Sequence, residues 1–329
     1  MKKALRITLL VAAVWFALSW AVAAISLRAG FGRRDQIPAV ELSYSEETAQ
    51  VCERRPCNFY AGENRLSGWI LQSTSGDKDK GLIVIVHGLG AGADTHLAEA
   101  IRFVENGYTV LLFDGTGTRA SEGWGVRGLT QGALDLDAAL DFVRKDEQLK
   151  ELPLIVYGHS MGGYAAAVVT SSHPEIDGIV SICAFDKPLS EMMEMAKKKA
   201  GVIAYPGYPG LAMQYLVLFG QDGNRSAAKA LSESKIPALI VAGAKDRVVP
   251  YEASLYAKKE EIDDPAASYL MIDEEGRAGH VGIWLSGSAN RMRVLVQEGV
   301  MDPDPAGCNE LDDAFMESVL AFMDASVLE

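Results

Sequence analysis

Short apolar runs alternate with amphipathic stretches along most of the chain after residue 46. Several runs are apolar nearly throughout, which is typical of strands that are buried on both faces. The stretch 129–148 instead has apolar positions at helical spacing, and Thr130 can cap this helix. This alternation predicts an α/β fold with a mostly parallel central sheet flanked by helices. The predicted strands are residues 64–72, 81–88, 107–115, 152–160, 177–185, 237–246 and 267–273.

The alternation breaks once, between Asp186 and Lys235. An insertion at about 186–235, between two strands, is expected to fold as a cap over an active site. It contains several methionines and the aromatic and aliphatic run AYPGYPGLAMQYLVLF. If these side chains line a pocket, the acyl or alcohol part of the substrate is apolar. Ordinary core packing of the same side chains is the alternative.

Residues 7–27 form an uncharged apolar segment that follows a basic start. At 1.5 Å per residue, a helix of this length can cross a hydrocarbon core of about 30 Å. Two alternatives are a signal peptide cleaved after Ala21-Val22-Ala23 and a helix in the core of a soluble protein. The expected organisation is an N-terminal transmembrane helix or signal peptide at 1–27, a linker at 28–45 and the main domain at 46–329.

Either an anchor or a signal peptide places the main domain outside a cytoplasmic membrane, as a single-pass protein or in secreted or periplasmic form. Cys52 and Cys57 are close enough for a short-loop disulfide, which would suit an oxidising compartment, and unpaired thiols are the alternative. The net charge of −13 argues against a nucleic-acid partner, because a phosphate backbone would be repelled.

The sequence Gly158-His159-Ser160-Met161-Gly162 follows one predicted strand and opens a helix-forming stretch. In this context G-x-S-x-G is typical of a sharp turn that exposes a nucleophilic serine. Glycines two residues to either side allow the strand and the helix to approach without Cβ clashes. Ser160 is therefore the candidate nucleophile.

A serine hydroxyl needs a base that removes its proton, and the base needs a group that orients it. His280 lies in a loop after the last predicted strand, and Asp246 follows the strand before it. The chain order serine, aspartate, histidine is the order expected for this motif. Asp186, which follows an earlier strand, competes with Asp246 for the role of the acid.

The glycine-rich segment VHGLGAG at 86–92 follows another apolar run and can form an oxyanion hole. The backbone N–H groups of Leu89 and Met161 are the candidate donors, and His87 is expected to hydrogen-bond the backbone of this loop. No cofactor is implied. Motifs for a metal site, such as H-E-x-x-H or paired C-x-x-C, do not occur in the sequence.

The chain contains, in order, HGLG, GHSMGG, GAKDRVVP and AGH. Over about residues 60–325 it resembles the α/β-hydrolase family, in its serine aminopeptidase-like and monoacylglycerol lipase-like branch. The apolar amino terminus is similar to that of membrane-anchored bacterial members. The resemblance implies the α/β-hydrolase fold. It also implies that Ser160, Asp246 and His280 form a catalytic triad and that the backbone N–H groups of Leu89 and Met161 are the oxyanion donors.

The sequence therefore predicts a membrane-anchored serine hydrolase that cleaves carboxylic esters, as a carboxylesterase or lipase-like enzyme acting on small or lipid-like esters. An amidase or aminopeptidase, or an acyltransferase, could use the same triad. A binding module that retained the fold without activity is the alternative outside enzymes. The chain departs from the family after Asp114, where it reads DGTGTRASEG.

Overall fold

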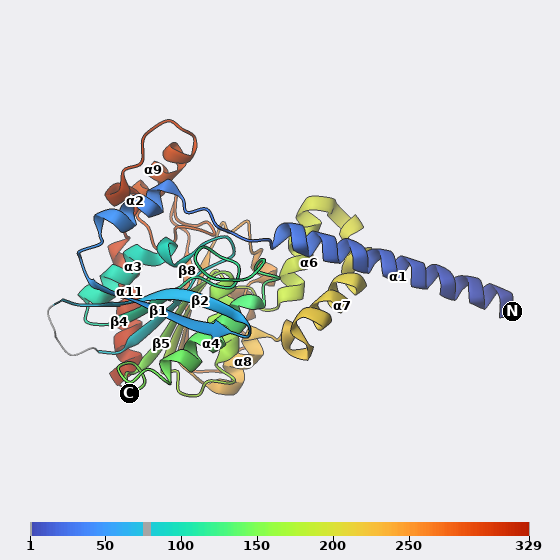
Figure 1. The fold of residues 1–329 in the computed structure, drawn as a ribbon, viewed down its shortest axis with the longest axis horizontal. Helices are drawn as coiled ribbons and strands as arrows, with labels where there is room; N and C mark the ends of the chain where they lie inside the picture. Colours follow the sequence, from blue (N-terminus) through green and yellow to red (C-terminus); the bar gives the residue numbers. More distant parts are fainter. Residues whose placement is uncertain (1, 75–79, 329) are drawn as a thin grey trace.

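The computed structural model, which describes residues 2–74 and 80–328, contains an eight-stranded sheet with the order β1-β2-β4-β3-β5-β6-β7-β8 (Figure 1). β2 is antiparallel to β1 and β4, and the pairs from β4 to β8 are parallel. The mostly parallel sheet confirms the predicted α/β fold, and all seven predicted strands are present. The strands are β1 (Glu53–Ala61), β2 (Asn64–Gln72), β3 (Leu82–Val86), β4 (Thr109–Phe113), β5 (Leu154–His159), β6 (Gly178–Ile182), β7 (Ala238–Gly243) and β8 (Ala267–Ile272).

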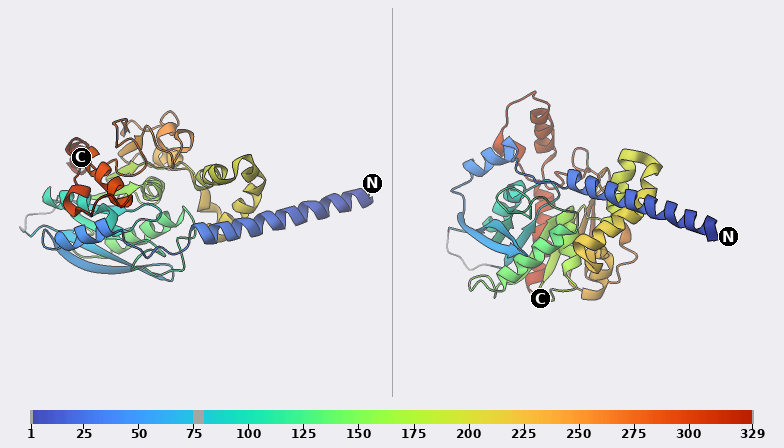
Figure 2. Two further views of the ribbon diagram at one scale, coloured as in Figure 1. Left: turned by 90° about the horizontal axis from the view of Figure 1, so that it is seen from above. Right: turned by 45° about the vertical axis from the view of Figure 1, so that its right-hand side comes forward.

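Helices cover both faces of this sheet (Figure 2). Successive side chains of a strand point to opposite faces, so Val156 of β5 packs in the core with α4, α5 and α8, whereas Ile155 packs with α3 and α11. The central strand is therefore held between two layers. The helices are α1 (Lys2–Gly30), α2 (Ala39–Glu47), α3 (Leu97–Glu105), α4 (Gln131–Val143), α5 (Met161–Val169), α6 (Pro188–Ala200), α7 (Tyr208–Phe219), α8 (Ala227–Ser234), α9 (Gly287–Gln297), α10 (Pro305–Cys308) and α11 (Asp313–Leu328).

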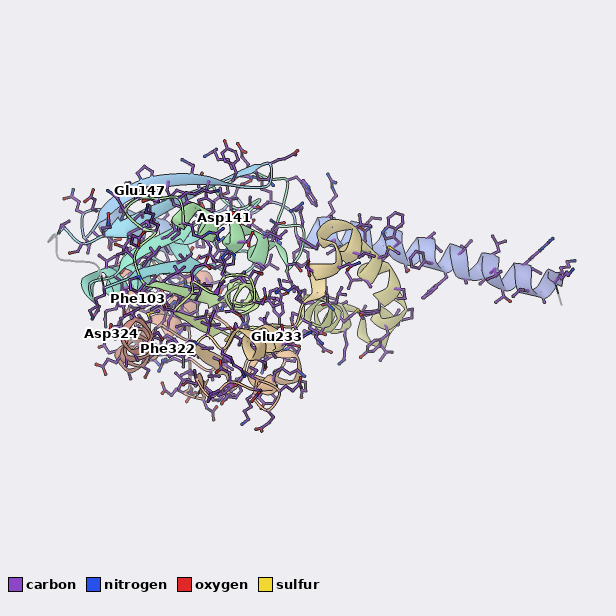
Figure 3. The ribbon with its side chains drawn as sticks, turned by 90° about the horizontal axis from the view of Figure 1, so that it is seen from below. Phe103, Asp141, Glu147, Glu233, Phe322 and Asp324 are labelled. Atoms are coloured by element: carbon purple, nitrogen blue, oxygen red, sulfur yellow. The ribbon has the colours of Figure 1, made fainter. Side chains whose placement is uncertain are left out.

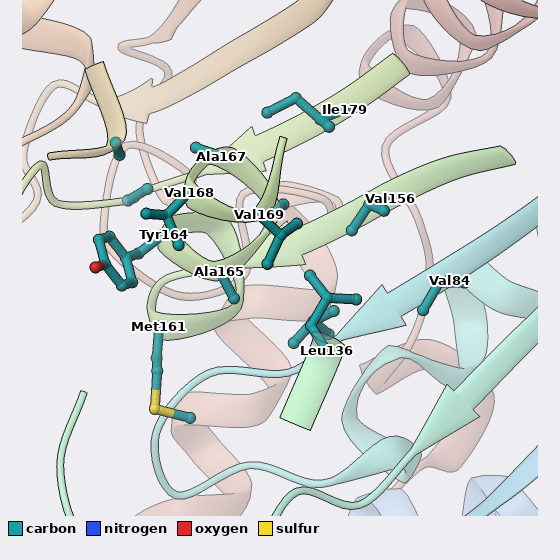
Figure 4. Packing of buried hydrophobic residues seen from close by; sticks show 14 of the residues in the cluster. Val84, Leu136, Val156, Met161, Tyr164, Ala165, Ala167, Val168, Val169 and Ile179 are labelled. Carbon is teal, nitrogen blue, oxygen red and sulfur yellow. The ribbon is translucent and has the colours of Figure 1, made fainter. Parts of the chain in front are cut away.

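The helix that follows β5 is buried along its whole length. Figure 4 shows Tyr164 and Ala165 of α5 in the same core as Leu136 of α4 and Val84 of β3. Small residues in this helix allow it to lie close to the sheet. The start of α5 is thereby fixed relative to the end of β5.

The opposite face is closed by the last helix. Figure 3 shows Phe322 and Asp324 of α11 near Phe103 of α3. The hydroxyl of Tyr108, just before β4, donates a hydrogen bond to Asp324 Oδ1 at 2.7 Å. The C-terminal helix is therefore tied to the central part of the sheet.

The segment predicted as a linker at 28–45 is ordered and packs on the main domain. The guanidinium of Arg33 donates hydrogen bonds to the carbonyl oxygens of Arg119, Ser121 and Gly123 at 2.6–3.0 Å. The segment ends in α2, whose buried Glu41 pairs with the buried Arg119 at 3.5 Å. The polar composition of this segment is thus explained by hydrogen bonds to the domain.

None of the four cysteines is paired in the described part of the chain. Cys57 lies within β1 and enters the core that contains α4 and α5, while Cys52, just before β1, enters the core on the other face. Side chains five residues apart in an extended segment point to opposite faces. The disulfide between Cys52 and Cys57 is therefore not formed, and the cysteines give no support for an oxidising compartment.

The insertion at 186–235 folds into α6, the 3-10 helix η2 (Gly201–Gly207), α7, the 3-10 helix η3 (Gln221–Asn224) and α8. Thr130 lies at the N-cap of α4 but does not cap it, because its hydroxyl donates a hydrogen bond to the carbonyl of Gly223 at 2.7 Å. The insertion is thus attached to the start of α4.

Among the described residues, α1 is the one helix that is long and apolar enough to cross a membrane. It projects from the domain and passes beside α7 and η2 (Figure 1). Most of its apolar side chains are exposed, but Ser19, Ala23 and Leu27 are buried. These three residues are spaced four apart and form one face of the helix.

Candidate active site

Ser160 lies at a sharp turn between β5 and α5. Its backbone has φ 57° and ψ −114°, a conformation that is strained for a residue with a Cβ atom. The amide of Ser160 donates a hydrogen bond to the carbonyl of Ile182 in β6 at 2.7 Å, and its carbonyl accepts one from Tyr164 at 2.9 Å. The turn is therefore held from both sides.

The two glycines of the G-x-S-x-G motif are required by close backbone contacts. A Cβ atom on Gly158 would lie 2.2 Å from the carbonyl oxygen of Gly162. A Cβ atom on Gly162 would lie 2.0 Å from the carbonyl oxygen of Val86. Because both contacts are with backbone atoms, neither can be relieved by a side-chain rotation, and only glycine fits at these positions.

The structure brings Ser160, His280 and Asp246 together in one hydrogen-bonded row. Nε2 of His280 lies 2.9 Å from Ser160 Oγ, and Nδ1 of His280 lies 2.7 Å from Asp246 Oδ2. The imidazole and the carboxylate are both nearly buried, with side-chain exposures of 9% and 8%. This geometry allows the histidine to take a proton from the serine while the carboxylate fixes its orientation.

The two candidate acids have different surroundings. Oδ1 of Asp246 accepts hydrogen bonds from the amides of Val248 and Val249 at 2.7 and 3.0 Å, which leaves Oδ2 for His280. Asp186 instead accepts from the hydroxyl of Ser226 and the amide of Ala228, at 2.6 and 3.0 Å. Asp186 therefore holds the start of α8, and Asp246 is the acid in contact with the histidine.

The predicted oxyanion loop lies against the serine turn. A Cβ atom on Gly88 would lie 3.2 Å from the Cβ of Ser160, so the loop backbone is in contact with the serine. The N–H groups of Leu89 and Met161 donate no hydrogen bond to any residue in 2–74 or 80–328. Both predicted donors are thus free for a ligand, and that of Met161 belongs to the positive end of α5.

His87 holds the oxyanion loop to its neighbour, as expected. Its Nδ1 lies 2.8 Å from the carbonyl oxygen of Gly88, and its Nε2 accepts a hydrogen bond from the amide of Gly115 at 2.9 Å. Burial lowers the pKa of His87 to about 4, so the ring is neutral and its Nδ1 carries the proton. The departure after Asp114 is therefore compatible with an ordered loop beside the site.

His159 is a site residue that the sequence reasoning did not assign. Its Nε2 lies 2.8 Å from the backbone carbonyl of His280. Burial, and then the neighbouring His280, hold the pKa of His159 well below its usual value, so the neutral ring donates this hydrogen bond. The G-H-S-M-G motif gives the only signal, because it places a histidine next to the serine.

Cys183 follows β6 and lies close to His159 and His280, with ligand atoms of the three residues within 4.8 Å of one another. A metal ion there would need a deprotonated thiol, but burial raises the pKa of Cys183 well above its usual value. Metal binding by His280 would also break its hydrogen bond to Ser160 or to Asp246. His280 is therefore better explained as a member of the hydrogen-bonded row than as a metal ligand.

Comparison with known proteins agrees with this architecture. Residues 77–217, which contain Ser160 but end before Asp246 and His280, match the family described as serine aminopeptidase S33. The alpha/beta hydrolase domain-containing protein WAV2 of Arabidopsis thaliana is 26% identical over 233 residues, which cover 68% of this chain and 70% of that protein.

Solved structures share the same fold. An esterase of Pyrococcus furiosus superimposes with a TM-score of 0.60 and 17% identity, over 90% of this chain and 98% of that chain. A membrane phospholipase A, described as a bacterial virulence factor, superimposes with a TM-score of 0.51 and 17% identity over 99% of both chains. The chain thus has the α/β-hydrolase fold, and the match of residues 77–217 to a hydrolase family supports an enzyme of the hydrolase class.

Proposed function

We propose that this protein is a serine hydrolase that cleaves carboxylic esters through an acyl-enzyme on Ser160. The observation that carries the proposal is the position of His280, within 2.9 Å of the serine oxygen and 2.7 Å of a buried carboxylate. Such an arrangement raises the nucleophilicity of a serine that is otherwise a weak nucleophile.

In the first half of the reaction, Oγ of Ser160 attacks the ester carbonyl carbon while Nε2 of His280 takes the hydroxyl proton. The negative charge that develops on the carbonyl oxygen is stabilised by the N–H groups of Leu89 and Met161, each worth about 3 kcal/mol. The tetrahedral intermediate then collapses, His280 gives its proton to the departing alcohol, and the acyl group remains on Ser160.

In the second half, water attacks the acyl-enzyme and gives a proton to the same nitrogen of His280. Collapse of the second tetrahedral intermediate returns this proton to Ser160 and releases the carboxylic acid. Asp246 keeps its hydrogen bond to the ring and stabilises the imidazolium that forms twice in the cycle. The reaction needs no cofactor, because every proton moves between Ser160, His280, water and the alcohol.

Two of the similar structures favour esters as the substrate class, since one is described as an esterase and the other as a phospholipase A. The test is a series of p-nitrophenyl esters of increasing acyl length, measured with the wild type and Ser160→Ala. We expect the variant to lose at least about 10³-fold in kcat/KM on every ester that the wild type cleaves. Equal hydrolysis by both proteins would refute the proposal.

An aminopeptidase is the second candidate, because the family that matches residues 77–217 is described by that activity. It would use the same acyl-enzyme with an amine as the leaving group. Aminoacyl p-nitroanilides and dipeptide amides, assayed beside the esters, separate the two. If kcat/KM is higher for an amide than for every ester tested, the substrate class is amides and not esters.

We also propose that residues 1–27 remain in the mature protein as a single-pass anchor, with the hydrolase domain at 46–329 and the insertion at 186–235 as its cap. Burial of Ala23 and Leu27 in the main core supports retention of the segment. The intact mass of protein extracted from membranes tests this directly. A mass that begins after Ala23 would show a cleaved signal peptide instead.

A further inference from the structure

The insertion exposes large apolar side chains on the two elements that pack against α1. Val202 and Ile203 of η2 are 74% and 80% exposed, and Val217 of α7 is 64% exposed. Soluble proteins rarely gather such side chains on neighbouring exposed elements without a partner. We call the side chains of Val202, Ile203, Leu216 and Val217 the apolar face of the insertion.

The insertion and α1 are in backbone contact. A Cβ atom on Gly210 of α7 would lie 2.3 Å from the carbonyl carbon of Ser19 and 2.5 Å from the amide nitrogen of Trp20. Figures 1 and 2 show α7 beside the part of α1 nearest the domain. Close approach at a small residue is typical of helices that pack within a membrane.

The length of the apolar run determines how deep the contact between α1 and α7 lies in a membrane. Residues 7–27 span about 31 Å as a helix, which is just enough for a hydrocarbon core of about 30 Å. Arg28 marks the end of the run, and Trp20 precedes it by eight residues, or about 12 Å along the helix. If the whole run is in the membrane, Gly210 and the adjoining part of α7 lie below the membrane surface.

Basic residues lie next to the apolar face. Lys197, Lys198 and Lys199 end α6 immediately before η2. Basic side chains beside an apolar surface suit the anionic headgroups that border the hydrocarbon region. The amino group of Lys198 also donates a hydrogen bond to the carbonyl of Arg247 at 2.7 Å, one residue after Asp246. Helix α6 of the insertion is therefore joined to the loop that carries Asp246.

From these contacts we infer that the apolar face of the insertion is immersed in the lipid bilayer beside α1, so that the enzyme takes esters of membrane lipids directly from the bilayer. This inference rests on the proposed ester hydrolysis and on the retention of α1. The occupant of the face is lipid, since the depth of the α1 contact places the insertion in the membrane whether or not a second copy is present.

The test uses the full-length protein reconstituted in vesicles of phosphatidylcholine and phosphatidylglycerol. Ile203→Cys and Val217→Cys carry an environment-sensitive fluorophore. The matched control is Val300→Cys, because Val300 is 67% exposed and follows α9, a helix that Figure 1 shows away from α7 and from the projecting end of α1. The native cysteines are buried, and labelling of the wild type gives their background.

We expect lipids with a nitroxide on the acyl chain to quench both probes in the insertion at least threefold more than the probe at residue 300. Equal quenching at all three positions overturns the inference. So does a probe at residue 203 that escapes lipid quenching while the unlabelled Ile203→Cys variant forms a disulfide between two copies under a mild oxidant, because the face would then be a dimer interface.

A second variant tests the link to the substrate. The double variant Val202→Asp/Ile203→Asp should keep its turnover of a short soluble ester within twofold but lose at least tenfold on a long-chain ester embedded in vesicles. Unchanged turnover of the embedded ester overturns the inference. The quenching result does not depend on turnover, so a wild type that is quenched as expected but cleaves no ester would contradict the proposed function alone.

Discussion

Nε2 of His159 donates a hydrogen bond to the backbone carbonyl of His280, 121 positions further along the chain, at 2.8 Å. The residue immediately before Ser160 therefore holds the loop that supplies the base. His159 is itself fixed by aromatic contacts with His96 and Trp284, whose ring centroids lie 5.9 and 5.0 Å away. One rigid group thus sets the position of the serine turn and the histidine loop together.

His159→Phe keeps an aromatic ring at this position but removes the hydrogen bond to His280. We expect kcat for a p-nitrophenyl ester to fall about tenfold with a smaller change in KM, because misplacement of a base affects the transition state more than binding. Steady-state kinetics and a thermal melt check this. An unchanged kcat in a folded variant would show that His159 does not position the base.

The contrast between Asp246 and Asp186 gives a matched pair of variants. Asp246→Asn should lower kcat by about 10³- to 10⁴-fold, since the amide favours the wrong tautomer of His280. Asp186→Asn should keep kcat within a few-fold, because the carboxylate of Asp186 accepts hydrogen bonds from Ser226 and Ala228 at the start of α8. The opposite ranking of the two variants would transfer the role of the acid to Asp186.

The glycines beside Ser160 should tolerate no side chain. Gly158→Ala forces a Cβ atom against the backbone of Gly162, and we expect a loss of more than about 2 kcal/mol in the free energy of unfolding. Gly207→Ala is the control, because a Cβ atom at this position meets nothing within 4 Å. Chemical denaturation of both variants checks the difference, and equal stabilities would contradict the tight turn.

Glu191 of α6 predicts a pH dependence of stability. Its side chain is buried, and neither carboxylate oxygen has a hydrogen-bond partner in the described ranges. Burial, only partly offset by Lys198, raises the pKa of Glu191 to about 8. Between pH 4.5 and 8 the unfolded chain therefore ionises this group while the folded chain does not, so the stability falls as the pH rises through that window.

Glu191→Gln removes this cost. We expect the variant to be more stable than the wild type by about 2 to 4 kcal/mol at pH 8, and by nearly nothing at pH 4.5. Glu194→Gln, three residues further along the same helix, is the control, because the side chain of Glu194 is 30% exposed and pairs with Lys197 at 3.2 Å. Thermal melts of the wild type and Glu191→Gln at the two pH values check this. A gain in stability that is equal at both pH values would contradict the raised pKa of Glu191.

The strands could be predicted from the sequence where both faces are buried, because runs such as LIVIV at 82–86 are apolar throughout. β1 could not be predicted in this way. It is an edge strand with the sequence ERRPCNFYA, and only Cys57 and Phe59 are buried in it. Charged residues on an exposed edge hide the alternation on which strand prediction depends.

The candidate triad could be predicted from the sequence because each of its members follows a strand. The carboxyl ends of parallel strands share one edge of the sheet. The contact of His159 with His280 and the packing of Ser19 against Gly210 join residues more than 100 positions apart. No local pattern encodes such contacts, so they could be found only in the folded structure.

The proposed activity requires Ser160 to be a nucleophile that is activated by His280. The most direct measurement is mass spectrometry of the full-length protein after reaction with a fluorophosphonate, with peptide mapping of the adduct. We predict one adduct on Ser160, a rate of labelling at least about 10³-fold lower in His280→Ala, and no adduct in Ser160→Ala. An adduct that persists in Ser160→Ala, or a folded wild type that does not react, would contradict the claim.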